Sequence, residues 1–327
     1  MQSSFSDLEY AAKKKVTRRD RFLAEIETIT PWAALVAEID GYYPKGGGRG
    51  RPPIGLERML RMYIAQQCFG LSDEGIEDAI YDSQAIRRFV GIDLSREDAP
   101  DATTLLKFRR LLECHGLTRR IFETINAHLA EQGLMLREGT IVDATLIAAA
   151  PSTKNRAKAR DPQMHQTKKG KQWYFGMKAH IGADAHTGLV HSLKGTAANA
   201  ADVSEAHVLV HGDESEVFAD AGYQGADKRA ENAGSSARWH IAMKRGERKK
   251  LTDSKEDQHT EHWERLKAKI RAKVEHPFHV VKNLFGHRKV RYRGLAKNEA
   301  QLFTLFALGN LFLGQRYLRR HCAQGAP

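Results

Sequence analysis

Two aspartates lie within or directly after apolar, β-branched runs of this chain. Asp143 interrupts the run Thr140 to Ile147, and Asp220 ends a second such run. A carboxylate is costly in a buried strand unless it is paired with a cation or binds a metal. Glu275 adds a third acidic group in a segment, Arg271 to Gly286, that has the character of a helix. Together they predict a site for divalent cations, which commonly serve phosphoryl transfer when carboxylates bind them.

The chain before Gly139 is predicted to be helical. Apolar residues of Ile54 to Phe69 recur at helical spacing, and Ser72 and Asp101 are suited to cap two later helices. Short helices with arginines outside are typical of a helix-turn-helix DNA-binding module. An ordinary bundle with solvated arginines explains the same pattern. The arginines expected outside are Arg58, Arg61, Arg87, Arg88, Arg109 and Arg110.

After Gly139 the pattern predicts strands that alternate with helices. Asp184 to Gly188 is the expected turn of a hairpin, and Asp202 with Glu205 forms a capping box for a helix through Val208. The apolar segment Leu302 to Leu313 is predicted to be a packed helix. The expected strands are Thr140 to Ile147, Tyr174 to Ala183, Leu189 to Lys194, Glu216 to Ala219 and His240 to Lys244.

A net charge of +12 suits a polyanionic partner, although many basic proteins bind none. The basic segment Lys154 to Lys171 is predicted to be a loop that clamps the DNA backbone, with a solvated insert as the alternative. Gly46 to Pro53 contains Arg49 and Arg51 in a pattern like that of minor-groove hooks. A glycine linker before a helix explains that stretch equally well.

The three cysteines are far apart and the fifteen histidines show no zinc-ligand spacing. This pattern predicts reduced thiols and no zinc site. The first residues lack the charged and apolar regions of a signal peptide, and Leu302 to Leu313 is too short to span a bilayer. We therefore expect a cytoplasmic, nucleoid-associated protein without a membrane partner.

The residues around the three carboxylates resemble the DDE transposases of bacterial insertion sequences. The match is with the insertion-sequence-five family, in the group with the motif Tyr-x2-Arg-x3-Glu-x6-Lys. Arg271, Glu275 and Lys282 are in register with that motif, whereas Ala268 replaces its tyrosine. Four further stretches carry the resemblance: Gly50 to Gly55, His165 to Gly170, Trp173 to Gly182 and Lys297 to Leu302.

The resemblance implies an α+β chain: a helical N-terminal DNA-binding domain (residues 1–138), a ribonuclease-H-like catalytic domain with a mixed sheet (139–315) and a C-terminal tail (316–327). In that fold the first and fourth strands are adjacent, so Asp143 and Asp220 meet. Glu275 completes a catalytic triad that binds two Mg²⁺ ions, for which Mn²⁺ can substitute. The residues expected to contact DNA are Arg271, Lys282, Lys168, Lys169, Lys171, Lys178, Arg49 and Arg51.

One face of the glutamate helix is expected to carry Arg271, Glu275 and Lys282, because the three are spaced by about one and two turns. Pro277 is expected to kink this helix or begin a new one. A different stripe is predicted to be buried and consists of Trp263, Leu266, Ile270 and Val274.

The resemblance implies DNA cleavage and strand transfer at terminal inverted repeats, by a homodimer or larger assembly on double-stranded DNA. The first alternative is a ribonuclease-H-like nuclease, which would keep the carboxylates but would have less need of the basic loop and the helical module. A domesticated transposase that only binds DNA would tolerate loss of a carboxylate, yet Asp143, Asp220 and Glu275 are all present.

Overall fold

The computed structural model describes residues 10, 12–46, 52–136, 138–156, 158–232 and 234–324. Arg49 and Arg51 lie outside these residues. The first part of the chain is helical, as predicted, and two helices, α2 and α3, precede those expected from the spacing. Its helices are α2 (Arg18–Ile29), α3 (Trp32–Asp40), α4 (Leu56–Phe69), α5 (Asp73–Asp82), α6 (Gln84–Val90), α7 (Ala102–Cys114) and α8 (Leu117–Glu131).

Both predicted helix caps are confirmed. The Ser72 hydroxyl accepts a hydrogen bond from the Gly75 amide at 2.9 Å, and the Asp101 carboxylate accepts one from Thr104 at 2.5 Å. Each cap satisfies an amide that has no partner within its helix, and thereby fixes where α5 and α7 begin.

The second part is built on one mixed sheet. The strands are β1 (Gly139–Ala148), β2 (His165–Lys169), β3 (Gln172–Asp184), β4 (Val190–Ala197), β5 (Glu216–Ala219) and β6 (Arg238–Ile241). Their order is β2-β3-β1-β5-β6, and β4 also pairs with β3. β1 is antiparallel to β3 and parallel to β5, which is parallel to β6. The predicted adjacency of the first and fourth expected strands is confirmed as the pair β1–β5.

Two predictions about connecting segments are wrong. The basic segment Lys154 to Lys171 is not wholly a loop, because β2 forms within it and pairs with β3. The expected helix after Asp202 is a 3-10 turn, η1 (Asp202–Val208), which no side chain caps. Asp202 is not a capping residue because its carboxylate binds Lys178 instead, at 2.8 Å.

The glutamate segment is helical but changes type along its length. It runs from α10 (Lys255–Arg271) through a 3-10 turn, η5 (Ala272–Val274), into α11 (Glu275–His279) and the π-helical turn η6 (Val280–Leu284). α10 follows a short helix, α9 (Arg245–Arg248). The buried stripe was predicted wrongly: Val274 is buried, but Trp263 is 46% exposed. Buried instead is Glu264, which accepts a hydrogen bond from the Met243 amide and pairs with Lys267.

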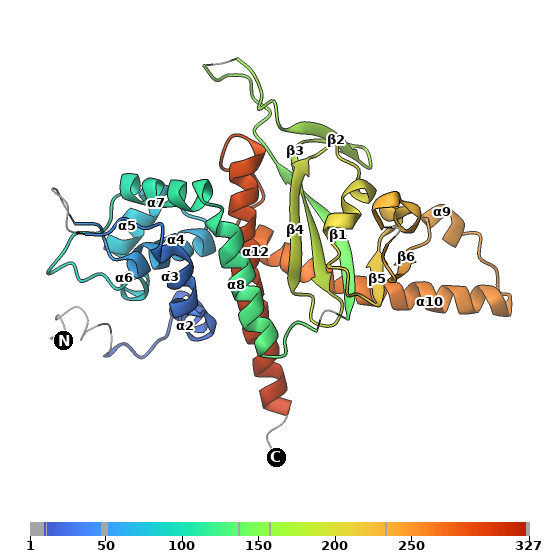
Figure 1. Ribbon diagram of the computed structural model, residues 1–327, viewed down its shortest axis with the longest axis horizontal. Helices are drawn as coiled ribbons and strands as arrows, with labels where there is room; N and C mark the ends of the chain where they lie inside the picture. The colour runs from blue at the N-terminus through green and yellow to red at the C-terminus, as the bar shows by residue number, and fades with distance from the viewer. Residues whose placement is uncertain are drawn as a thin grey trace.

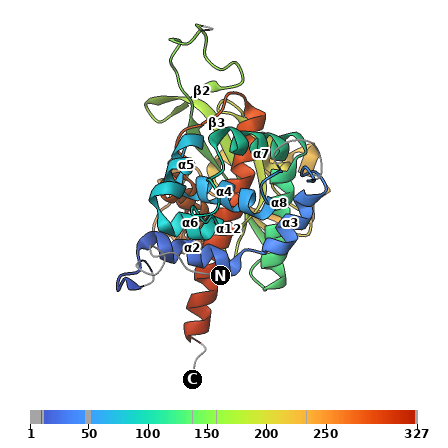
Figure 2. The ribbon, with the colours of Figure 1, turned by 90° about the vertical axis from the view of Figure 1, so that its left-hand side faces the viewer.

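The last helix, α12 (Leu295–Gln324), joins the two parts of the molecule. It lies beside α8, between the other N-terminal helices and the sheet (Figure 1), and the second view places α2–α7 in front of it (Figure 2). Asn310 on α12 donates to Asn126 of α8 at 2.8 Å and to the Val190 carbonyl of β4 at 2.6 Å. The rings of Phe122 and Phe303 meet edge to face.

One apolar core consequently extends from the helices to the sheet and includes Leu60, Leu112, Ile141, Ile181 and Leu305. A smaller core on the other face of β1 and β5 contains Tyr223 and part of η1. The predicted fold, a helical N-terminal region followed by a ribonuclease-H-like domain with a mixed sheet, is confirmed. Within the described part of the chain, no helix is both long and apolar enough to cross a membrane.

Candidate active site

Asp143 and Asp220 lie at neighbouring positions of the sheet. Val142 of β1 pairs with Ala219 of the parallel strand β5. Asp143 follows Val142 and Asp220 follows Ala219, so the two aspartates occupy equivalent positions on adjacent strands. Asp143 Oδ1 accepts a hydrogen bond from the Ala144 amide at 2.7 Å. Asp220 Oδ1 accepts one from the Gly222 amide at 2.8 Å and caps the 3-10 turn η2 (Ala221–Tyr223). The backbone therefore fixes both carboxylates.

Glu275 approaches the two aspartates from the helical side. It is the exposed first residue of α11, and the half-buried Arg271 precedes it by one turn. The pKa of Asp143 is raised to about 6, chiefly by burial and also by the charges of Asp220 and Glu275, while the Ala144 amide and Arg271 act in the opposite direction. Asp220 and Glu275 are thus near enough to Asp143 for their negative charges to oppose its ionisation.

Lys282 points at β1 beside these carboxylates, and its Nζ donates to the Thr145 hydroxyl at 2.6 Å. Thr145 is two residues beyond Asp143, so it lies on the same face of the strand, roughly 7 Å along it. Burial lowers the pKa of Lys282, and the charges of Lys169 and Arg288 add to the effect. The charge of Glu275 opposes this shift, so Glu275 also lies near Lys282.

A small cavity of about 210 Å³ lies beside Lys282. Lys169, Lys282 and Arg288 line it together with Tyr174, and none of the described residues in its wall is acidic. Asn283 holds Arg288 through two hydrogen bonds to its side-chain oxygen. Three cations without a carboxylate form a site suited to an anion such as a DNA phosphate. The spacing of the sequence did not predict Arg288.

The other expected DNA contacts lie in different surroundings. Lys168 is on β2 near the ring of Trp173, which is 63% exposed, and Lys171 is exposed at the tip of the β2–β3 hairpin. Lys178 is different, because its ammonium binds the Asp202 carboxylate at 2.8 Å and the Ala200 carbonyl at 2.7 Å. We assign Lys178 to the support of Asp202 rather than to the DNA surface.

His191, His211 and Glu214 form a cluster whose ligand atoms lie within 4.8 Å of one another. The Thr140 hydroxyl joins two of them, because it donates to Glu214 Oε1 and lies 3.0 Å from His191 Nε2. His211 Nδ1 accepts a hydrogen bond from the Asp213 amide.

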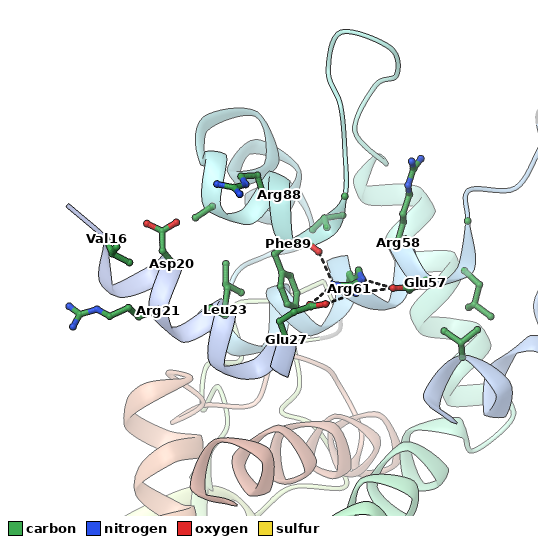
Figure 3. A pocket seen from close by; sticks show the side chains of 17 residues that line it. Val16, Asp20, Arg21, Leu23, Glu27, Glu57, Arg58, Arg61, Arg88 and Phe89 are labelled. Atoms are coloured by element: carbon green, nitrogen blue, oxygen red, sulfur yellow. Dashed lines mark hydrogen bonds and ion pairs between the residues drawn. The ribbon is translucent and has the colours of Figure 1, made fainter. Parts of the chain in front are cut away.

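The arginines of the helical region are not all outside, contrary to prediction. Arg109 is 6% exposed and binds Asp73 through two hydrogen bonds of 2.6 and 2.9 Å. Arg61 pairs with Glu27 and Glu57, as Figure 3 shows, and lies over the Trp32 ring. Arg58 pairs with Glu97, and Arg87 donates to backbone carbonyls. Arg88 and Arg110 are exposed.

A larger cavity, of about 1030 Å³, lies between α2, α4 and α6 in the helical region (Figure 3). Its wall is mainly apolar, with Leu23 and Phe89 inside and Arg21, Arg58 and Arg88 around it. None of the three carboxylates Asp143, Asp220 and Glu275 lines this cavity.

Two protein-family models match the chain. The model described as "Transposase DDE domain" matches residues 135–311, more than half of the chain. The model described as "Transposase domain (DUF772)" matches residues 10–111. The first match spans the whole sheet, Asp143, Asp220 and Glu275, and the second spans α2–α6 and most of α7.

Proposed function

Because this chain belongs to the DDE transposase family, a family of DNA-binding enzymes that use divalent metal ions, we propose that it cleaves DNA at the terminal inverted repeats of an insertion sequence and joins the freed ends to target DNA. The observation that supports the proposal is that Asp143 and Asp220 follow paired residues of β1 and β5, with the charge of Glu275 near enough to act on Asp143. The spacing of Arg271, Glu275 and Lys282 supports the insertion-sequence-five family, with Ala268 in place of its tyrosine.

The three carboxylates fit a pair of Mg²⁺ ions. Their oxygens are the ligands that this cation prefers, and their mutual repulsion is relieved by bound positive charge. We propose that Asp143 and Asp220 share the ions and that Glu275 completes the coordination of one, with Mn²⁺ as a substitute. When bound, such ions lower the pKa of an attacking water or 3′-hydroxyl and stabilise the leaving oxygen.

The residues around the carboxylates would orient the DNA strand. Lys282 is held by Thr145 beside Asp143, and Lys169 and Arg288 share its cavity. In the proposed complex these cations hold a backbone phosphate close to the scissile bond. Arg271, half-buried near Asp143, would steady Glu275 and a neighbouring phosphate. Lys168 and Lys171 on the β2–β3 hairpin would contact the backbone further away.

We assign end recognition to the N-terminal helices, residues 1–138, and chemistry to residues 139–315. The internal ion pairs of Arg61 and Arg109 leave other cations to contact DNA. Those exposed just before α2, at its beginning and on α6 are Lys14, Lys15, Arg18, Arg19, Arg21 and Arg88. The proposed tail, residues 316–327, begins within α12, which continues to Gln324. Phosphate contacts by these cations would make binding fall steeply with salt.

Transposition joins two ends in one event, so we propose that a dimer or larger assembly acts on DNA at the bacterial nucleoid in the cytoplasm. The test uses a donor plasmid that carries paired terminal repeats, a target plasmid and Mg²⁺. The parent protein should nick the repeat ends and produce joined products. Nicking without joining would indicate a nuclease, and binding without nicking at any Mg²⁺ or Mn²⁺ concentration would indicate a DNA-binding protein only.

Asp143→Asn, Asp220→Asn and Glu275→Gln each remove one negative charge with little change of shape. We expect each variant to lose cleavage and joining by at least about 1000-fold while it keeps binding to repeat DNA, since such sites fail when one metal ligand is lost. A variant that retained substantial Mg²⁺-dependent strand transfer would remove that residue from the proposed triad.

A further inference from the structure

Trp173 is the most exposed large hydrophobic residue in the part of the chain that the structure describes, with 63% of its surface accessible to solvent. It lies on β3, close to the tip of the β2–β3 hairpin. A single exposed ring is common on protein surfaces and by itself identifies no site. The position of Trp173 in the sheet is what connects it to the carboxylates.

The strand pairing places Trp173 on the same face of the sheet as Asp143. Asp143 lies directly opposite Ile181 of β3, and opposed residues of an antiparallel pair project from one face. β3 keeps step with β1 as far as Gly176 and with β2 from there to Gln172. Ile181 and Trp173 are separated by an even number of positions, so strand alternation returns Trp173 to the face of Asp143.

The cavity beside Lys282 adjoins this ring. Phe175 is the neighbour of Trp173 on the same face, and it lines the cavity that Lys282 and Arg288 share. Trp173 lies two residues further towards the hairpin tip, roughly 7 Å along the strand. This is about the rise of two nucleotides in one DNA strand, at roughly 3.4 Å each. A strand with one phosphate in the cavity would therefore bring a neighbouring base within reach of the indole.

Basic side chains flank the aromatic rings of this face. Lys168 lies opposite Trp173 in the hairpin, with its Nζ 5.8 Å from the centre of the indole ring. The Arg160 guanidinium lies 5.3 Å from the centre of the Phe175 ring, and Lys171 is exposed at the hairpin tip. Surfaces that bind single-stranded DNA combine such cations, which hold the backbone, with aromatic rings on which bases stack.

We propose that Trp173 stacks on an unpaired base of the DNA strand whose phosphate lies in the cavity beside Lys282. The inference rests on the proposed function, because it concerns DNA bound at the same site. In a paired duplex each base is covered by its neighbours, so the indole can reach the face of a base only where the strands are separated. Trp173 would thereby hold an opened strand beside the carboxylates without any part in metal binding.

The test measures DNA binding by the full-length protein in a chelator, so that no cleavage takes place. The probes are a paired terminal-repeat duplex, the same duplex opened by mismatches on both sides of the cleavage position, and opened duplexes in which one base at a time is replaced by an abasic site. The variants are Trp173→Ala and Trp173→Phe. The matched control is Trp263→Ala, because Trp263 is 46% exposed but lies on α10.

We expect the parent protein to bind the opened duplex more tightly than the paired one. Trp173→Ala should weaken binding of the opened duplex by about 5- to 150-fold, the range that stacking on one base contributes, and should change binding of the paired duplex little. Trp173→Phe should keep most of the affinity, and Trp263→Ala should bind as the parent does. One abasic position should weaken binding by the parent and leave Trp173→Ala unaffected, because the base and the ring form a single contact.

Parental affinity of Trp173→Ala for the opened duplex would overturn the inference. An equal loss for the paired, opened and abasic duplexes would also overturn it, because Trp173 would then be a general surface contact. A smaller assembly of DNA-free Trp173→Ala than of the DNA-free parent, measured by sedimentation, would assign the ring to a contact between copies of the chain and reject the stacking role.

This binding assay involves no chemical step, so its outcome is separable from that of the proposed function. If the parent neither nicks nor joins DNA with Mg²⁺, yet the abasic position and Trp173→Ala show the coupled loss, the proposed function fails and the stacking contact remains a feature of DNA binding. If the parent nicks and joins DNA and the coupled loss is absent, the inference alone is contradicted.

Discussion

In the helical region, the inward-facing arginines pair with carboxylates. Beside β1, by contrast, three basic side chains share a cavity whose described wall contains no carboxylate. Arg109 lies against Asp73, and Arg61 lies against Glu27 and Glu57. Lys282 instead has Lys169 and Arg288 as its charged neighbours in the cavity. The first arrangement neutralises charge inside the protein, and the second leaves positive charge available to a ligand.

This difference shows that a basic residue is better judged as a DNA contact by its partners in the structure than by the basic sequence around it. A buried ion pair stabilises the fold, because removal of one member leaves the other charge buried without a partner. A cluster of like charges weakens the fold slightly and is retained where an anion binds. Substitutions in the two regions should therefore separate stability from activity.

The largest effect on stability is expected from Arg109→Met. It leaves Asp73 partly buried without the guanidinium that binds both of its oxygens. We expect a loss of about 3–5 kcal/mol in the free energy of unfolding, measured by urea denaturation. Arg119→Met is the control, because Arg119 is 69% exposed and pairs with Glu123 on the helix surface, where such pairs contribute at most about 0.5 kcal/mol. Equal stability of the two variants would mean that the Arg109 pair does not hold the helices.

Lys282→Met should have the opposite character. Lys282 repels Lys169 and Arg288 but attracts Glu275, so its removal should change the Tm little. Strand transfer should fall by about 10- to 100-fold, because one phosphate contact close to the reaction is lost. Lys255→Met, at the exposed beginning of α10, should leave both quantities unchanged. Strand transfer at the parental rate by Lys282→Met would make Lys282 an ordinary lysine of the fold.

The junction of the two regions provides a smaller, pH-dependent effect. His287 is 1% exposed, and burial lowers its pKa to about 4, with Arg291 adding to the shift. Arg291 itself donates to the Gly70 and Leu71 carbonyls at the end of α4. The pKa of His287 in the folded protein lies below its ordinary value of 6.5. As the pH falls from about 6.5 to about 4, His287 therefore binds a proton in the unfolded chain but not in the folded protein. Stability should therefore fall in that window, by up to about 1.4 kcal/mol per pH unit from His287.

The variant His287→Leu should flatten this slope, and urea unfolding between pH 4 and 7 measures it. His180 carries a similarly lowered pKa, so part of the parental slope should remain in the variant. A slope identical to that of the parent would mean that His287 is protonated in the folded protein.

The sequence predicted the features that local patterns encode. The caps at Ser72 and Asp101 act within one helical turn, and the hairpin turn at Asp184 is closed by its own carboxylate, which accepts from the His186 and Thr187 amides. The order of the strands and the three acidic positions also follow from local runs and a family motif. These features need no knowledge of distant contacts.

The errors concern contacts between residues far apart in the chain. Arg109 meets Asp73 across 36 positions, and Lys178 meets Asp202 across 24, so neither pair is visible in the local spacing. The stripe on α10 was misassigned because that helix buries Glu264, whose carboxylate binds the Met243 amide across 21 positions. The beginning of α2, with Lys13 to Arg21, was a basic run that sequence reasoning could have singled out.

The most direct test of the carboxylate site uses a pre-cleaved terminal-repeat duplex with a free 3′-hydroxyl and a supercoiled target, so that only the joining step is measured. We predict joining by the parent protein with Mg²⁺, no joining with a chelator, and none by Asp220→Asn, which should still bind the duplex. Joining by Asp220→Asn at the parental rate, or by the parent without a divalent cation, would contradict the account.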